Sequence, residues 1–268
     1  MTVSSVAGAG NFVLAGQAIE GVRTFAGQQV TISFWAKADA SKNIAIECQQ
    51  SFGTGGSPSS RVNAIGTVKK ALTARWQKIT NTVTITSVAG KTLGTDGNDS
   101  LDLYIWFDAG SDFNSRNDSL GHQSGTFDIA QVQVEPGPVA TPFELRPIGT
   151  ELALCQRYFW FSGMSKGYSI ASGQAFGPST AGYLVPLPVP MRSTHVTTGA
   201  NSLHGSTAGG GSVLYQTIVA AKVIDTSKLY IMLALGGGST GLTAGHGTLL
   251  SIGTGSNDGS LSLSAELL

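Results

Sequence analysis

Hydrophobic and polar residues alternate with a period of two in the first half of the chain, along 28–39, 43–51, 75–86, 100–110 and 125–135. Successive side chains of a β-strand point to opposite faces, so each stretch predicts a strand with one buried face. Clusters of Gly, Ser, Asn and Asp separate the stretches. Alternating strands divided by such turns are typical of an antiparallel sandwich or jelly roll.

The second half of the chain continues this pattern with fewer charges, and strands are expected within 194–201, 212–223, 228–237, 247–255 and 260–268. The stretch 182–191 alternates Leu184, Leu187 and Val189 with prolines. Because proline donates no ladder hydrogen bond, we expect an edge strand or an extended arm there.

Four prolines lie close together between the two halves, at Pro136, Pro138, Pro142 and Pro147. Proline fixes φ, removes a backbone donor and restricts the residue before it. The segment 136–147 is therefore expected to run extended over the surface, and it marks the natural division of the chain.

A short helix is predicted directly after the prolines. Thr150 is placed to cap it, and Glu151 lies favourably in its first turn. The helix is apolar on more than one side, with prominent side chains at Leu152, Cys155, Tyr158 and Phe159. Such a helix needs neighbours, which are either the same helix in two other subunits, at a three-fold joint, or the chain's own jelly roll. We favour the three-fold joint.

The predicted fold class is therefore all-β. It comprises an N-terminal antiparallel jelly roll or β-sandwich in 1–146, a short connecting helix in 147–160 and a C-terminal β-sandwich-like domain in 161–268.

Composition narrows the classes of partner. Charged residues make up 12% of the chain, the formal net charge is zero and no Lys/Arg cluster stands out, so binding to nucleic acid is not expected. The longest apolar run, 229–235, is too short for a membrane span, which needs about 20 residues as a helix. Cys48 and Cys155 have no metal or redox spacing, and both are expected to be buried thiols.

Catalytic motifs are weak. The histidines show no H-E-x-x-H spacing, and they are His122, His195, His204 and His246. The stretch GGGSTG at 236–241 matches two glycine-rich motifs around Ser239, but no helix would follow it, so a turn is expected. Asp102 and Asp108 lie about 20 Å apart along one strand, too far for an acid/base pair. No catalytic residue and no cofactor is therefore assigned.

Oxygen-rich loops raise the question of a structural Ca²⁺ ion. Asp96 and Asp99 in the DGND stretch carry the hard oxygen ligands that Ca²⁺ takes. Plain Asx turns account for the same residues, so the ion is kept only as an alternative.

The sharpest candidate site is a sugar-binding face. In 100–110, Tyr104 and Trp106 offer flat apolar rings on the side away from the predicted core. Hydroxyl-binding groups accompany them at Asp102, Asp108, Glu47 and Gln49. The alternative is that the two aromatic rings pack under a loop or against another subunit.

The stretch FDIAQVQVEPGPVATPFELRPIGTELALCQRYF resembles a block found in tail fibres and related structural proteins of tailed bacteriophages and prophages. TISFWAKAD, LGTDGNDSLDLYIWFDAGSDFNSR and SLGHQSGTFDIAQVQVE also resemble the carbohydrate-binding-module-like jelly roll of those proteins. The resemblance covers roughly residues 5–160. The chain that follows it is similar in layout to the domains that follow this block in the family.

The resemblance implies a virion protein, made in the host cytoplasm, that acts as a tail fibre or similar appendage. It implies a homotrimer that contacts other virion proteins and adheres to bacterial surface polysaccharide. A purely architectural role, such as head decoration or a tail collar, and a polysaccharide-degrading enzyme are the alternatives. Family jelly rolls begin with strands upstream of the VSSVAGAGNFVL stretch, so we expect the first strand or strands to be missing here.

Overall fold

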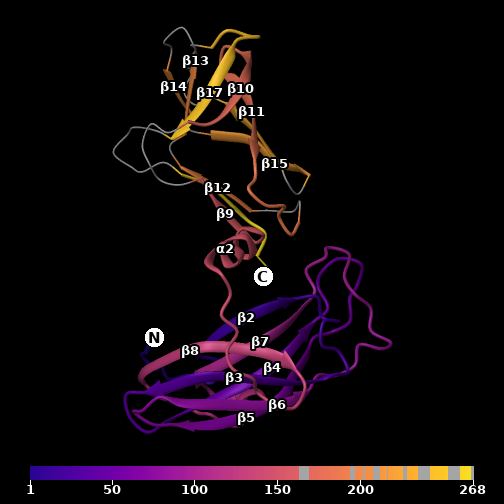
Figure 1. Cartoon of the computed structure of the whole chain (residues 1–268), viewed down its shortest axis with the longest axis vertical. Helices are drawn as coiled ribbons and strands as arrows, with labels where there is room; N and C mark the ends of the chain where they lie inside the picture. The colour runs from indigo at the N-terminus through magenta and orange to yellow at the C-terminus, as the bar shows by residue number, and fades with distance from the viewer. Residues whose placement is uncertain are drawn as a thin grey trace. The chain divides into compact units, whose positions relative to one another are not determined.

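The computed structural model describes residues 1–162, 169–193, 197–201, 203–207, 212–215, 217–225, 228–234, 242–252 and 260–266. It describes side chains in 1–162, 169–193, 242–251 and 261–266. The chain forms two compact units, Met1–Leu145 and Arg146–Glu266, and both are built mainly from antiparallel strands (Figure 1).

The first unit is a sandwich of two four-stranded antiparallel sheets (Figure 1). One sheet has the order β1-β8-β3-β6, with bounds Thr2–Val3, Gly125–Pro136, Gln29–Ala38 and Gln77–Thr84. The other has the order β2-β7-β4-β5, with bounds Phe12–Glu20, Ser100–Ala109, Lys42–Ser51 and Val62–Leu72. The prediction of an N-terminal sandwich is confirmed.

The core of the first unit lies between its sheets and is built from the apolar half of each alternating stretch. It includes Ile32, Phe34, Ile44, Ile46, Leu101, Leu103, Ile105, Phe107 and Phe127. Each such side chain contributes roughly 1.5–3 kcal/mol when it is fully removed from water. Cys48 is buried in this core, and desolvation, with smaller effects of Glu47 and Asp102, raises the pKa of its thiol to about 12.

Five predicted strands correspond to β3, β4, β6, β7 and β8, but the alternation did not reveal β2 and β5. In β5, register shifts opposite β4 interrupt the period of two, and Ala64 and Gly66 have positive φ there. In β2, only Phe12, Val13 and Leu14 form a clear apolar cluster, and Gly16 stands in the middle. Both strands also form the edges of their sheet, and few of their side chains are fully buried, which leaves a weaker pattern.

The proline segment runs extended beside the sheet that contains β3, as predicted. Thr31 Oγ1 donates to the Gly137 carbonyl at 2.7 Å, and Lys78 Nζ donates to that of Thr141 at 3.2 Å. The Thr141 hydroxyl and amide donate to the Glu135 carboxylate and, with Gln133, hold the pKa of that group below its ordinary value. The segment is thus fastened to the first unit by polar contacts.

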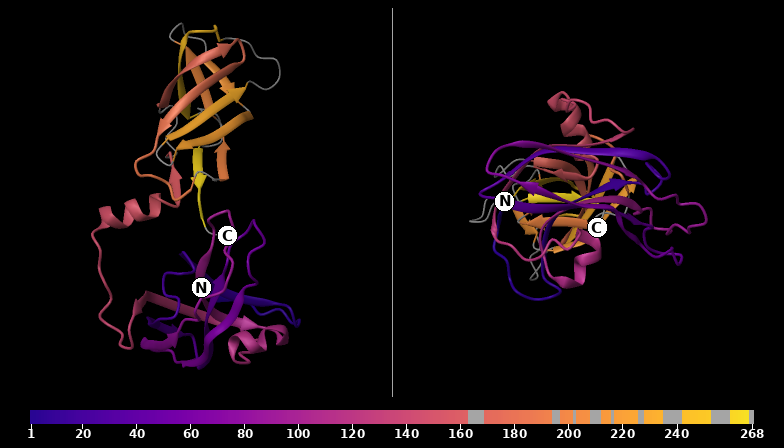
Figure 2. Two further views of the ribbon diagram at one scale, coloured as in Figure 1. Left: turned by 90° about the vertical axis from the view of Figure 1, so that its right-hand side faces the viewer. Right: turned by 90° about the horizontal axis from the view of Figure 1, so that it is seen from below.

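The helix α2 spans Ile148–Gln156, which lies within the predicted range 147–160 but begins before the predicted cap at Thr150 (Figure 2). The cap position belongs to Pro147, and no side chain caps the helix, so the expected role of Thr150 is wrong. The reason is that the Pro147 carbonyl already accepts from the amides of Thr150 and Glu151. Within the described chain, α2 contains no buried residue.

The side chains predicted for the joint are largely exposed. Leu152 is 56% exposed and Phe159 46%, and Tyr158 is partly buried. Phe159 lies outside the helix, in strand β9 (Phe159–Phe161). Cys155 is exposed, so the expectation that it is a buried thiol is wrong. These exposures do not identify the neighbour that the helix was expected to need.

The second unit contains a seven-stranded and a three-stranded antiparallel sheet. The first has the order β14-β13-β17-β10-β11-β16-β15, with bounds Ser212–Tyr215, Leu203–Thr207, Gly247–Ile252, Ser169–Gly177, Thr180–Pro186, Lys228–Ala234 and Thr217–Asp225. The second has the order β12-β18-β9, with bounds Thr197–Asn201, Ser260–Ser264 and Phe159–Phe161. Side chains from both sheets meet in a cluster that includes Tyr183, Val185, Leu250, Leu261 and Leu263, so the prediction of a sandwich-like second domain is confirmed.

The prediction of an edge strand in 182–191 is wrong. β11 pairs with β10 on one side and β16 on the other. It ends at Pro186, so proline occurs only where the ladder stops and the interior amides remain available. The GGGSTG stretch at 236–241, Ser239, His195 and the side chain of His204 lie outside the described residues. No helix in the described part of the chain is long and apolar enough to cross a membrane.

Candidate functional site

The outer face of the sheet β2-β7-β4-β5 gathers the predicted sugar-binding residues. On β7 the core takes every second side chain, which turns Asp102, Tyr104, Trp106 and Asp108 to the other face. The register pairs Glu47 with Tyr104 and Gln49 with Asp102. The structure therefore brings five of the six predicted residues together across two strands, and Asp108 lies apart from them near the strand's end.

Glu47 forms the centre of a buried polar network, and its side chain is 0% exposed. Its carboxylate accepts from Arg116 Nε at 2.8 Å, Arg116 Nη2 at 3.1 Å and Trp106 Nε1 at 3.0 Å. The bulge in β5 adds the amide of Ala64, at 2.8 Å. Four donors compensate this charge, so Glu47 is held too firmly to serve as a free hydroxyl-binding group.

Trp106 is only 1% exposed. The rings of Phe12 and Phe113 lie with their centroids 5.6 Å and 5.4 Å from it, and the Arg116 guanidinium lies 5.2 Å from its ring. Phe113 and Arg116 belong to the segment between β7 and β8, in η1 (Ser111–Phe113) and α1 (Asn114–Asn117). The prediction that Trp106 offers an open ring is therefore wrong, because this segment covers it.

Asp102 and Tyr104 lie in a second polar cluster on the same face. Ser100 Oγ donates to Asp102 Oδ1 at 2.7 Å, while Gln49 Nε2 and the Tyr104 hydroxyl donate to Oδ2 at 2.9 and 3.2 Å. Burial, and then the charge of Asp102, raise the pKa of Tyr104, so the phenol keeps its proton at neutral pH. Arg116 Nη2 also donates to Gln49 Oε1 at 3.1 Å and joins this cluster to Glu47.

A pocket of about 260 Å³ opens beside this cluster. Its lining residues are Gly16, Gln17, Ala18, Ser51, Arg61, Ser100, Asp102 and Tyr104. Of the predicted residues, only Asp102 and Tyr104 reach it. The alternation in 100–110 pointed to these two, whereas nothing in the local sequence distinguished Ser51, Arg61 or Ser100 as parts of a site.

Gly16 leaves room for the Tyr104 ring. The two residues are register partners on β2 and β7, and a Cβ atom at position 16 would lie 2.9 Å from the ring carbons Cδ1 and Cε1. Glycine therefore lets the phenol ring lie close against the backbone of β2. The ring consequently forms one wall of the pocket.

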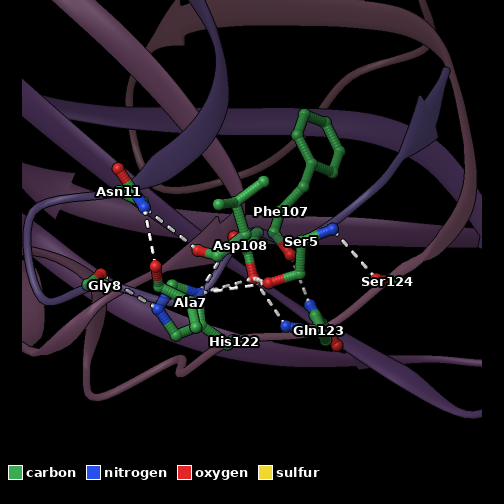
Figure 3. A network of polar contacts seen from close by, with 10 residues as sticks. Ser5, Ala7, Gly8, Asn11, Phe107, Asp108, His122, Gln123 and Ser124 are labelled. Carbon is green, nitrogen blue, oxygen red and sulfur yellow. Dashed lines mark hydrogen bonds and ion pairs between the residues drawn. The ribbon is translucent and has the colours of Figure 1, made fainter.

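Asp108 takes part in a separate network that fastens the N-terminal segment to the sandwich (Figure 3). His122 Nδ1 lies 3.1 Å from Asp108 Oδ2, and Ser5 Oγ donates to Asp108 Oδ1 at 2.9 Å. His122 Nε2 lies 3.1 Å from the Gly8 carbonyl. A Ser-His-Asp triad needs the serine and the aspartate on different ring nitrogens. Here both contact Nδ1, so the geometry is that of a structural clamp.

The clamp predicts a pH-dependent stability. Both ring nitrogens of His122 face acceptors, and only the imidazolium form can donate to both. Hydrogen bonding to Asp108 raises the pKa of His122. Protonated His122 therefore stabilises the folded protein fully below the pKa of histidine in the unfolded chain, about 6.5. This stabilisation is lost as the pH rises through the higher pKa of His122 in the folded protein. Unfolding measured from pH 5 to 9 should show this decline in the parent protein, and His122→Ala should lack it; superimposable profiles would contradict the clamp.

The two calcium candidates are engaged in loop contacts. Asp96 Oδ2 accepts from Thr54 Oγ1 at 2.7 Å, and Asp99 Oδ2 accepts from the Val22 amide at 2.8 Å. No group of three His, Cys, Asp or Glu side chains suited to a metal ion occurs among the described residues. These two carboxylates therefore act here as acceptors that fix neighbouring loops.

Comparison with known proteins gives few matches. No family model and no curated protein matches the chain. A family 4 carbohydrate-binding module (CBM4) is 22% identical, with a TM-score of 0.29, over 46% of this chain and 61% of that structure. A tandem of family 22 modules (CBM22) from Xyn10C of Paenibacillus barcinonensis is 11% identical, with a TM-score of 0.28, over 94% and 83%. The chain thus spans about three fifths of the first structure, and both neighbours are carbohydrate-binding modules.

Proposed function

We propose that the first unit binds glycans in the pocket beside Tyr104, and that the protein is a tail-fibre or similar appendage component of a tailed bacteriophage. The observation that carries the binding proposal is the pocket itself, which combines one aromatic wall with fixed hydroxyl and carboxylate groups. Few polar groups of set orientation beside an apolar surface are the usual make-up of a small-molecule site.

The chemistry of the pocket suits a sugar ring. The face of Tyr104 can take the apolar C–H edge of a pyranose. Asp102 accepts three hydrogen bonds from the protein, and a carboxylate has about four acceptor positions, so one is left for a ligand hydroxyl. Ser51 and Ser100 line the same space. The volume, about 260 Å³, is below that of typical drug-sized sites and fits a single ring better than a long chain.

The assignment to a phage appendage rests on the resemblance of residues 5–160 to tail-fibre proteins. In that setting the protein is part of the virion, contacts other virion proteins and adheres to bacterial surface polysaccharide. Several weak pockets in one assembly gain avidity because later contacts are intramolecular. We propose adhesion without catalysis, since Asp102 is the one carboxylate among the described residues lining the pocket and glycoside hydrolysis generally uses two.

Tyr104→Ala tests the binding site. Removal of a central aromatic wall should weaken glycan binding by roughly tenfold or more, as measured by glycan-array screening followed by calorimetry on the best ligand. Trp76→Ala is the matched control, because Trp76 is 46% exposed and does not line the pocket. Equal affinity of Tyr104→Ala and the parent protein would refute a site beside Tyr104.

Assembly as a homotrimer through α2 is the second part of the proposal. The helix exposes Ile148, Leu152 and Leu154 at 84%, 56% and 42%, and Leu145, three residues before the helix, is 84% exposed. Three copies that bury these side chains together would remove this apolar surface from water. Light scattering on the full chain should give three times the chain mass, and Leu152→Glu should shift it toward one. A monomeric parent at micromolar concentration would contradict this assembly.

The architectural alternative has one observation in its favour. Trp106, the largest ring on the candidate face, is covered by the segment between β7 and β8 and contributes to packing. A fibre spacer or collar needs only such a rigid sandwich. A failure of the intact protein to bind any glycan on a broad array would favour this reading.

A further inference from the structure

The pocket holds two ionised side chains in very different states. The Asp102 carboxylate is 7% exposed and compensated by Ser100, Gln49 and Tyr104. Arg61 lies on the rim, just before β5, and is exposed. Within the described residues its guanidinium makes no hydrogen bond and no ion pair, whereas Arg116 donates from Nε and Nη2 to Glu47 and Gln49. The rim of the pocket therefore presents a cation whose donors face solvent.

We propose that the glycan taken by this pocket is acidic, with a carboxylate-bearing sugar such as a uronic acid placed against Arg61. This inference rests on the proposed function and names its ligand class. The guanidinium offers a planar fork of donors that matches a carboxylate in two parallel hydrogen bonds. A neutral sugar has no carboxylate to pair with the guanidinium, whose donors would then stay bonded to water.

The two charges also set the orientation of the sugar. Asp102 repels a second carboxylate and accepts from a hydroxyl, so the ligand's carboxylate lies on the Arg61 side and its hydroxyls lie toward Asp102 and Ser100. The Tyr104 ring, which lies close to β2 because position 16 is glycine, supports the apolar edge between them. The pocket thus recognises both ends of one ring.

The experiment uses the full chain and a pair of matched ligands, a glucuronic-acid-containing oligosaccharide and the same oligosaccharide after reduction of its carboxyl groups. Calorimetry at about 0.15 M salt should show about tenfold tighter binding of the acidic form, as expected for a hydrogen bond to a charged group. Arg61→Ala should abolish this preference, and Arg61→Lys should retain only part of it because the fork is lost. Arg75→Ala, which removes the same charge from an exposed position beyond the pocket lining, should leave it unchanged.

The outcomes separate the two proposals. Equal binding of both oligosaccharides that Tyr104→Ala weakens and Arg61→Ala leaves unchanged would overturn the acidic ligand and keep the glycan pocket. Binding of dextran sulfate as tight as that of the acidic oligosaccharide would also overturn it, since plain charge attraction would then suffice. Absence of binding to either oligosaccharide, to dextran sulfate and to a broad glycan array would overturn the proposed function itself.

Discussion

Arg116→Ala is expected to destabilise the first unit by about 3 kcal/mol or more. The substitution removes two of the four donors to Glu47, and both of them belong to the cationic guanidinium. The side chain of Glu47 is 0% exposed, and its carboxylate lies 2.8 Å from Arg116 Nε. A buried carboxylate left without its cation costs 3–5 kcal/mol, roughly, because the ion cannot recover its hydration. The measurement is equilibrium unfolding in urea, followed by the fluorescence of the tryptophans, with the transition of the first unit fitted separately.

Three further variants decide whether charge pairing is the cause. Arg116→Lys keeps the charge and loses the fork, so it should fall between the parent and alanine. Glu47→Gln combined with Arg116→Ala should be less destabilised than Arg116→Ala alone, because the neutral amide leaves no unpaired buried charge and still offers an acceptor oxygen to the donors from Trp106 and Ala64. Arg75→Ala should be close to neutral. A double variant as unstable as Arg116→Ala would show that the side chain acts by packing.

The sequence was sufficient to predict the sandwich and one face of the site. Alternation along β7 separates Leu103 and Ile105 from Asp102 and Tyr104 without reference to any other strand. The exposure of Trp106 could not be deduced in this way. It depends on Phe113 and Arg116 from a later segment and on Phe12 from an earlier one, which only the three-dimensional structure brings together.

The sequence predicted a short helix after the prolines, but it placed the start of that helix at the wrong residue. Composition after the prolines indicated a short apolar helix, but the start of α2 depends on the Pro147 carbonyl, which can accept from two successive amides. Arg61 was missed for a different reason. It has no motif around it, and its relevance follows only from the pocket that it forms with β2, β7 and the end of β4.

Trp106→Ala is expected to cost about 3–5 kcal/mol of unfolding free energy, the usual range for a fully buried large aromatic side chain. The ring is 1% exposed and supports Phe12, Phe113 and the Arg116 guanidinium at once. Its loss would leave a cavity under the covering segment and remove one donor to Glu47. Trp106→Phe should cost less, because it keeps most of the ring volume and three of the four donors to Glu47 remain.

Comparison with Tyr104 separates packing from binding on the same strand. Tyr104 is partly exposed and lines the pocket, so Tyr104→Ala should lose glycan affinity with a smaller loss of stability. Trp106→Phe should keep the affinity of the parent, measured by calorimetry on folded protein. If Trp106→Phe instead loses affinity as completely as Tyr104→Ala while remaining folded, the segment over Trp106 must open to admit the ligand, and the binding face would extend beyond the pocket beside Tyr104.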